Sequence, residues 1–312
     1  MHRFILMLLS VFVFTNYTNA QGCSDAGFCT AGSNADFSSE KYAAKKDSSQ
    51  SSPKRHFVKV GVGVALGEQS VFILTPHIEG SFQINPRSSI NIKTNLQTAI
   101  GKQATKFGMG DITISHSTNL LSKAKHQLVL NIGAKLATGR ATAKDKNKFE
   151  LPMVYQSSLG TFDLLLGLNY KFNYKLGVVN IATGYQQPLI HINRNSSIEN
   201  FDTLNAKSFI RKGDVFFRID KIFTIKKKFD LGVGALAIYH ILKDEIVLQD
   251  DSKVAIKGSQ GLTLNITALF GYRINDKIEI GLSAGFPVLV RDVRPDGLTR
   301  KFAIAPAFTY RF

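Results

Sequence analysis

Few side chains in this sequence have the types and the spacing that catalysis requires. The nearest approach to a nucleophile beside a base is the run Ser115-His116-Ser117. A serine becomes a nucleophile only when a base can accept its proton, so both side chains must lie on the same side of the backbone. The surrounding residues alternate between apolar and polar as in a strand, which points Ser115 and Ser117 away from His116. The run therefore does not favour a catalytic site.

Phosphate, metal and cofactor motifs are also missing from the sequence. The glycine-rich stretch Gly61–Gly67 lacks the spacing of a dinucleotide fingerprint, and no H-E-x-x-H, G-x-S-x-G or phosphate loop occurs. We therefore expect no catalytic residue, no cofactor, no metal and no enzymatic activity. The catalytic alternative is a lipid-modifying barrel enzyme, which would need a serine and a histidine together near the outer leaflet.

The two cysteines, Cys23 and Cys29, lie close together near the N-terminus. Asp25, Ala26 and Gly27 between them can form a turn. An exported protein meets an oxidising compartment, so this pair predicts a disulfide. Two thiols without a nearby histidine do not make a metal site.

The N-terminus has the pattern of a secretory signal peptide. The basic residues His2 and Arg3 precede the apolar run Phe4–Phe14, and Thr18-Asn19-Ala20 is an acceptable cleavage site. The run is too short for a spanning helix, and an uncleaved anchor is the alternative. The residues after the cysteines are rich in Ser and Lys and poor in apolar side chains, which is typical of a linker. We expect a signal peptide at 1–20, a disulfide-closed segment and flexible linker at 21–54, and a barrel at 55–312.

The rest of the chain alternates with period two in many separate segments. In the last of them, residues 301–312, bulky apolar side chains alternate with small and polar ones, which suits lipid on one face and a lumen on the other. We therefore expect an all-β fold, a transmembrane antiparallel up-and-down β-barrel of about 12 strands behind a short N-terminal periplasmic segment. The predicted strands are His56–Leu66, Val71–Ile84, Ser89–Ile100, Phe107–Asn119, His126–Thr138, Thr161–Phe172, Lys175–Tyr185, Ser208–Ile222, Phe229–Ile241, Leu262–Ile274, Lys277–Val288 and 301–312.

The connections between these strands alternate between short and long. Tight turns follow the second, sixth and tenth strands, as at Asn85-Pro86-Arg87 and Asn275-Asp276, whereas long connections fall near residues 140–159, 186–207, 243–261 and 291–300. The exceptions are the tight turn at 67–70 and the modest loop near 101–106. Short periplasmic turns and long outer loops are typical of outer-membrane barrels. Tyrosines near both ends of the predicted strands fit an interfacial girdle; they are Tyr170, Tyr185, Tyr239, Tyr272 and Tyr310.

Alternation places charged side chains of both signs on the inward face. Such an interior predicts a wet lumen crossed by ion pairs and without strong charge selectivity; the alternative is that the pairs knit the barrel shut. We expect His77 and His240 to be hydrated lumen residues rather than a metal or proton site. The lumen-lining candidates are Lys59, His77, Glu79, Lys93, Asp111, Lys135, Asp163, Lys171, Asp214, Arg218, Asp220, Asp230, His240, Arg273, Glu279 and Arg311.

The formal net charge is +16 and the mean hydropathy is −0.01. The basic residues are scattered over turns and inward positions, without a basic face or a nucleic-acid-binding module, so the charge does not indicate nucleic acid as a partner. Affinity for anionic outer-leaflet lipid or anionic solutes is the better interpretation. Mean hydropathy near zero agrees with a barrel, because lipid-facing and lumen-facing residues average out.

Two motifs resemble a known family. GMGDITI at 108–114 and LPMVYQSSLGTFDLLLGLNYKF at 151–172 resemble bacterial outer-membrane transporters of the phenol-degradation meta-pathway (MetA-type), related to FadL-like channels. The last strand, with Tyr310 and the terminal Phe312, resembles the C-terminal assembly signal of outer-membrane barrels. The resemblance implies passage of small, often hydrophobic molecules and contact with the barrel assembly machinery.

Together these patterns predict a channel in the outer membrane of a Gram-negative bacterium. We expect outer-membrane lipid and lipopolysaccharide, the assembly machinery and a small-molecule solute as partners. We expect a gate in the loop Gln186–Lys207, with the N-terminal segment as a second candidate gate. The alternative is a structural or anchoring barrel with a closed lumen. Its apolar anchors would lie in the same loop, at Leu189, Ile190, Ile192, Ile198 and Phe201.

The cysteine pair generates the first testable prediction. Cys23 and Cys29 should resist thiol labelling in the mature protein until a reductant is added. Because they close only a small loop, replacing both by serine should leave the barrel folded. Full labelling of both thiols without reductant would contradict the disulfide.

Overall fold

The computed structural model describes residues 56–67, 70–193, 206–226, 228–297 and 300–312. The predicted signal peptide, Cys23, Cys29 and the linker lie outside the described residues. Among the helices of the described part, none has the length and apolarity needed to cross a membrane.

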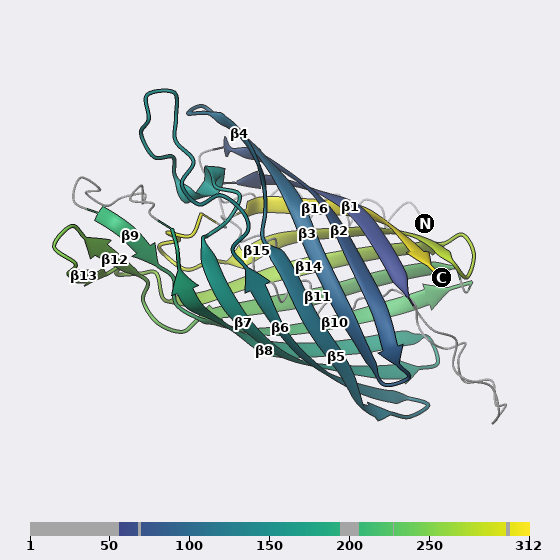
Figure 1. The fold of residues 1–312 in the computed structure, drawn as a ribbon. Coiled ribbons are helices and arrows are strands. Elements are labelled where there is room, and N and C mark those ends of the chain that lie inside the picture. Colours follow the sequence, from purple (N-terminus) through teal and green to yellow (C-terminus); the bar gives the residue numbers. More distant parts are fainter. Residues whose placement is uncertain (1–55, 68–69, 194–205, 227, 298–299) are drawn as a thin grey trace.

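The described chain is a closed antiparallel β-barrel (Figure 1). The main sheet contains 13 strands. Because β4 and β5 pair with successive halves of β3, they form one interrupted barrel strand, and the barrel wall therefore has 12 strands. Pairing of β1 with β16 closes the sheet. The barrel strands are β1 Phe57–Gly67, β2 Phe72–Asn85, β3 Ser88–Ile100, β4 Thr105–Met109, β5 Ile112–Ser122, β6 His126–Leu136, β7 Thr161–Tyr174, β8 Gly177–His191, β10 Asp214–Ile225, β11 Phe229–His240, β14 Gly261–Arg273, β15 Ile278–Leu289 and β16 Arg300–Arg311.

The two ends of the barrel differ. The start of β1, the end of β16 and the tight turns after β2, β7 and β14 lie at one end, here called the short-turn end (Figure 1). The opposite, long-loop end carries a 3₁₀ turn at Met153–Tyr155 and a three-stranded sheet outside the barrel. That outer sheet consists of β9 Ala206–Ile210, β12 Glu245–Leu248 and β13 Lys253–Ala255, with Phe209, Ile246 and Ile256 buried beneath it. The alternation of short and long connections agrees with the sequence prediction.

Side chains on the outer wall are apolar and exposed, and those on the inner wall are mostly polar and buried. Val60, Ile78 and Phe308 are 50%, 48% and 44% exposed, whereas the inward Glu79 is 5% exposed. A soluble protein would bury such an apolar band, so the band is the lipid-facing surface of a transmembrane barrel. The fold class predicted from alternation is therefore confirmed.

Three predicted strands differ from the observed ones. The strand predicted at Phe107–Asn119 is interrupted at Gly110 and Asp111, which are both buried, so the alternation shifts between β4 and β5. The strand predicted at Ser208–Ile222 is divided: its first residues belong to β9 of the outer sheet, and the barrel strand β10 begins at Asp214. Strand β8 continues to His191, so the first residues of the predicted gating loop belong to the barrel wall. Asn193 is buried, and residues 194–205 of that loop lie outside the described part.

The closing seam generates a prediction about assembly. The backbone of Phe312 pairs with that of His56 at 3.0 and 3.3 Å, and its ring lies 5.6 Å from the imidazole of His56. Aromatic contacts of this kind contribute about 1 kcal/mol, so Phe312→Ala should lower the ratio of folded to unfolded barrel about fivefold. The measurement is the heat-modifiable band in outer membranes. Phe217→Ala is the matched control, because Phe217 is an exposed outward phenylalanine of β10, away from the β1–β16 seam. Equal yields for the two variants would contradict a special role for the terminal residue.

Candidate functional site: the barrel interior

Many predicted lumen residues lie on one continuous row across neighbouring strands. Cross-strand partners along this row carry alternating charge, interrupted twice by threonine. The row runs Arg273, Glu279, Thr309, Lys59, Glu79, Lys93, Thr113, Lys135 and Asp163. Opposite charges facing each other across strands stabilise a sheet and keep buried charges paired. We call this row the charge ladder.

Ion pairs hold the ends of the ladder to neighbouring side chains. Lys135 lies between two carboxylates, with its Nζ 3.0 Å from Asp163 Oδ2 and 3.5 Å from Asp111 Oδ2. Arg273 Nη2 lies 2.9 Å from Asp230 Oδ2. Lys135 and both of its partners are almost completely buried, so these charges are removed from bulk water and depend on each other.

Two further pairs line the same interior. Arg311 Nη2 donates to Glu279 Oε2 at 2.9 Å, and Arg218 Nε donates to Asp220 Oδ2 at 2.7 Å. The side chains of Arg218, Arg273 and Arg311 are 11%, 14% and 18% exposed. These inward guanidinium groups are therefore not completely enclosed by other side chains. A barrel of this size lies between the side-chain-filled eight-stranded barrels and the open porins.

Two other predicted lumen residues, His77 and Lys171, lie near the charge ladder and also face inward. His77 lies over Gly61, where a Cβ atom would come within 2.6 Å of its ring, so that position needs glycine. The imidazole Nδ1 of His77 is 3.4 Å from the carbonyl oxygen of Thr75. Lys171 is half-buried, opposite Gln127 on one neighbouring strand and Asn180 on the other.

The inner wall also contains an apolar cluster that the sequence analysis did not single out. It combines residues from β7, β8, β10 and β11 and is buried; its members are Leu165, Ala182, Phe216, Leu236 and Ile238. The sequence does contain a sign of this cluster. Phe216 is apolar at an inward position where the alternation of its strand predicts a polar residue, and Leu165 lies within an apolar run. The interior is therefore polar along the ladder and apolar on the wall of β7 to β11.

Asp214 and His240 lie at the long-loop end, in a closed ring of six ionisable side chains. His240 points inward as predicted, but it is 1% exposed instead of hydrated, and its partners are Asp214 and Asp244. The other three members are Arg211, Arg291 and Asp296. The sequence analysis missed Arg211, Asp244, Arg291 and Asp296, because they lie in connections outside the regular strand pattern.

Distances around this ring are short. Arg211 Nη2 donates to Asp214 Oδ2, and Asp214 Oδ1 lies 2.6 Å from His240 Nδ1. His240 Nε2 lies 2.8 Å from Asp244 Oδ1, and Asp244 Oδ2 lies 3.9 Å from Arg291 Nη1. Arg291 Nη2 donates to Asp296 Oδ2 at 2.5 Å, and Arg211 Nε returns to the same oxygen at 3.5 Å. We call these six residues the ionic ring.

Charge balance explains how the ionic ring tolerates burial. Burial alone would raise the pKa of Asp296, but the guanidinium groups of Arg291 and Arg211 hold it below the ordinary aspartate value. Burial alone would lower the pKa of Arg211, but the carboxylates of Asp214 and Asp296 raise it. Three carboxylates and two guanidinium groups leave one negative charge, which a second proton on the imidazole of His240 would balance.

The ionic ring joins parts of the chain that are far apart in sequence. Arg211 lies between β9 and β10, His240 and Asp244 lie at the end of β11, and Arg291 and Asp296 lie between β15 and β16. The ring therefore fastens the outer sheet and the last long connection to the barrel wall.

A second element covers the long-loop end. Residues Leu151–Gly160, here called the cap segment, are buried almost throughout. Leu151, Val154 and Tyr155 pack against inward residues at the long-loop ends of β1, β2 and β3; those residues are Ala65, Val71, Ile73 and Ala99. Gln97 on the inner wall donates to the carbonyl oxygen of Gln156 at 2.7 Å. The cap segment thus lies against the inside of the barrel mouth.

One side chain organises the cap segment. Gln156 Oε1 accepts from Ala143 N at 2.7 Å, and Gln156 Nε2 donates to Ala143 O at 3.1 Å and to Leu151 O at 2.8 Å. The cap also touches the connection that carries Asp296, since a Cβ on Gly297 would lie 2.4 Å from Val154 N. Gly297 has φ +62, which only glycine adopts without strain. The cap segment and the ionic ring are therefore neighbouring parts of one cover.

The serine and histidine considered for catalysis do not meet. Ser115 and Ser117 face inward with Asn91, whose Nδ2 donates to Ser117 Oγ at 2.8 Å. His116 is exposed on the outer wall, and its Nδ1 lies 3.3 Å from Thr118 Oγ1. Within the described ranges, no group of three or more His, Cys, Asp or Glu residues is arranged to hold a metal ion.

No protein-family model matches the chain, and none of the curated proteins matches its sequence. Solved structures do resemble its barrel. An outer membrane channel from Pseudomonas putida F1 has a TM-score of 0.63 at 11% identity, with 86% of this chain and 99% of that one covered. The NanC porin has a TM-score of 0.50 at 8% identity, with 82% of this chain and 100% of that one covered. At these identities the likeness is one of fold, and the fold is that of outer-membrane channels and porins.

The ionic ring generates a prediction about pH. Asp296→Asn leaves two buried guanidinium groups short of a partner, which should lower the free energy of unfolding by about 3–5 kcal/mol at pH 7. Because the folded pKa of Asp296 is depressed, its contribution is complete above about pH 4 and is lost as the pH falls through the folded pKa. Urea unfolding of both proteins at pH 7 and at lower pH measures this.

Asp276→Asn is the control, because Asp276 is exposed in the β14–β15 turn. This variant should follow wild type at every pH. A difference between wild type and Asp296→Asn that persists unchanged at low pH would contradict the charge-based explanation.

Proposed function

We propose that the protein is an outer-membrane channel that passes small solutes through the barrel interior by passive diffusion. The observation that supports this most is the cover: a segment of the chain lies in one mouth of a barrel whose wall carries partly exposed, paired charges. A barrel that served only as an anchor would need no separate segment at its mouth. The fold shared with outer-membrane channels and porins agrees with this function.

Residues of the charge ladder are the proposed lining of the path. Their paired signs favour neither cations nor anions strongly, since each positive charge has a negative neighbour. We place the gate in the cap segment rather than in the predicted loop Gln186–Lys207, because part of that loop is barrel wall.

The solute class rests on two supports. The motifs at 108–114 and 151–172 resemble transporters of small hydrophobic molecules, and most of the second motif lies in the cap segment and β7. The apolar cluster around Phe216 provides an inner surface of suitable character. We propose small, partly hydrophobic solutes.

The cellular setting follows from the same proposal. A cleaved signal peptide would export the chain, and the barrel assembly machinery would insert it into the outer membrane. The short-turn end would face the periplasm, and the long-loop end would face lipopolysaccharide. No nucleic-acid partner and no enzymatic activity belong to this proposal.

Three apolar side chains at the long-loop end favour the anchoring alternative. Leu189, Ile190 and Ile192 are 64%, 57% and 51% exposed. An anchoring barrel would use such side chains against a surface assembly, and its lumen would stay closed.

Single-channel recording in planar bilayers tests the proposal. Gln156→Ala removes three hydrogen bonds that hold the cap segment, each worth about 1 kcal/mol. The open population should therefore rise on the order of a hundredfold. Uptake of a small aromatic solute and of a sugar into vesicles measures the solute class.

Gln127→Ala is the matched control. Gln127 lies on the inner wall near the short-turn end, and its Nε2 donates to Asn119 Oδ1 at 2.7 Å, away from the cap. This variant should conduct like wild type. If neither wild type nor Gln156→Ala passes ions or solutes, the channel is refuted and the anchoring function takes its place.

A further inference from the structure

One charged side chain stands on the lipid-facing wall. Among the described side chains of the barrel strands, Lys221 of β10 is the one Lys, Arg, Asp or Glu at an outward position. Its outward neighbours Ile219 and Phe223 are 40% and 36% exposed, and its cross-strand partner Val233 is 59% exposed. A lysine on the lipid face of a barrel costs about 2–4 kcal/mol at the bilayer midplane and little near the interface. The presence of Lys221 on the apolar outer wall therefore needs a physical explanation.

The side chain turns toward the short-turn end. Lys221 Nζ lies 5.1 Å from the centre of the Phe223 ring, which is two residues closer to that end. Lysine in a membrane places its stem along apolar surface and its ammonium group toward the headgroups. The ring of Phe223 stabilises the ammonium there through a cation–π contact. The charge is thus held on the side of Lys221 that faces the short-turn end.

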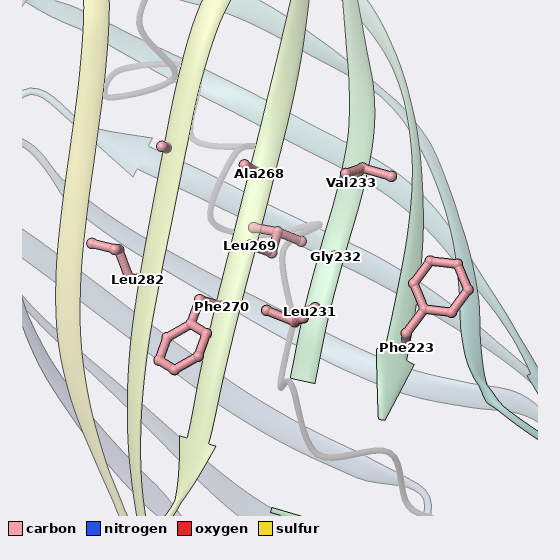
Figure 2. A pocket seen from close by; sticks show the side chains of 9 residues that line it. Phe223, Leu231, Gly232, Val233, Ala268, Leu269, Phe270 and Leu282 are labelled. Carbon is pink, nitrogen blue, oxygen red and sulfur yellow. The ribbon is translucent and has the colours of Figure 1, made fainter. Parts of the chain in front are cut away.

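An apolar groove lies beside Lys221 on the same outer wall (Figure 2). Its volume is about 360 Å³. The small outward side chains of Ala268 and Ala284 leave the floor low, while Leu231, Phe270 and Leu282 rise around it. Phe223 and Val233, which flank Lys221 along its strand and across it, also line the groove. The ammonium group and the groove therefore belong to one surface.

The adjacent rim is basic. Lys226 and Lys228 are exposed in the turn after β10, and Lys175 is exposed in the neighbouring turn before β8. Basic residues at a membrane surface attract anionic headgroups by about 1 kcal/mol each. The anionic headgroup of an amphiphile could contact the lysines of this rim, and its apolar chain could lie in the groove.

We propose that Lys221 and this groove seat one phospholipid of the leaflet at the short-turn end. Its phosphate contacts the ammonium of Lys221, and one acyl chain lies along Ala268 and Ala284. A second copy of the chain fits less well, because the described outward positions offer no carboxylate to oppose Lys221. A protein interface there would bury the charge without a partner, which is strongly unfavourable.

Native mass spectrometry of the full chain extracted from nanodiscs tests the seat. The probes are phosphatidylglycerol and a diacylglycerol with the same acyl chains but no phosphate. Wild type should retain one phosphatidylglycerol and little diacylglycerol. Lys221→Leu should lower retention about fivefold or more, and Ala268→Phe should lower it by filling the groove at unchanged charge. Lys253→Leu, which removes an exposed lysine of the outer sheet, should retain lipid like wild type.

Heat-modifiable mobility establishes that each variant is folded, and Lys221→Leu should insert readily because it removes a charge from the lipid face. Equal retention of diacylglycerol would overturn the role of Lys221. Unchanged retention by Ala268→Phe would overturn the groove. Displacement of the lipid by inorganic phosphate would reduce the seat to a headgroup site and overturn the chain contact. A dimer that Ala268→Phe dissociates would assign the groove to a second copy and overturn the proposal.

Discussion

Backbone hydrogen bonding in hydrocarbon is the constraint from which the rest of this structure follows. Every backbone N–H and C=O inside a membrane needs a partner within the protein, because no water is present to replace it. A sheet meets this requirement only when its edges are joined, and here β1 and β16 join them from Phe57 to Gly67. Closure forces one face of every strand outward into lipid and the other into an enclosed interior. The apolar outer wall and the polar inner wall are two results of this single requirement.

An enclosed interior creates a second requirement, which the charges meet. Ionisable side chains that point inward leave bulk water, so each needs a counter-charge or hydrogen-bond partner. Cross-strand register supplies these partners along the charge ladder, as at Glu79 between Lys59 and Lys93. At the long-loop end the strands no longer supply them, and side chains from the connections complete the ionic ring instead. The ladder follows from strand pairing, whereas the ionic ring follows from how the connections fold back.

This difference explains what could be predicted from the sequence. Alternation identifies barrel strands and the inward direction of Lys135, Asp163 and Glu279, because side-chain direction in a strand depends only on parity. It does not locate the division between β9 and β10, since Phe209 and Ile210 continue an apolar pattern across it. The cap segment has no period of its own: LPMVYQSSLG is buried by the walls around it rather than by its own pattern. Arg211 and Asp296 meet across 85 residues, which no local pattern encodes.

The ionic ring also has a consequence for the order of folding and the lifetime of the folded state. Its members come from three connections that are far apart in sequence, so the ring can close only when the strands that carry all three connections are in place. Interactions that form late are absent from the folding transition state, and they slow unfolding without speeding folding. Releasing β10, β11 or β15 at this end must therefore first separate buried ionisable groups of the ring. The ring therefore lowers the unfolding rate of the inserted protein and has little effect on its folding rate, so its contribution is to kinetic stability.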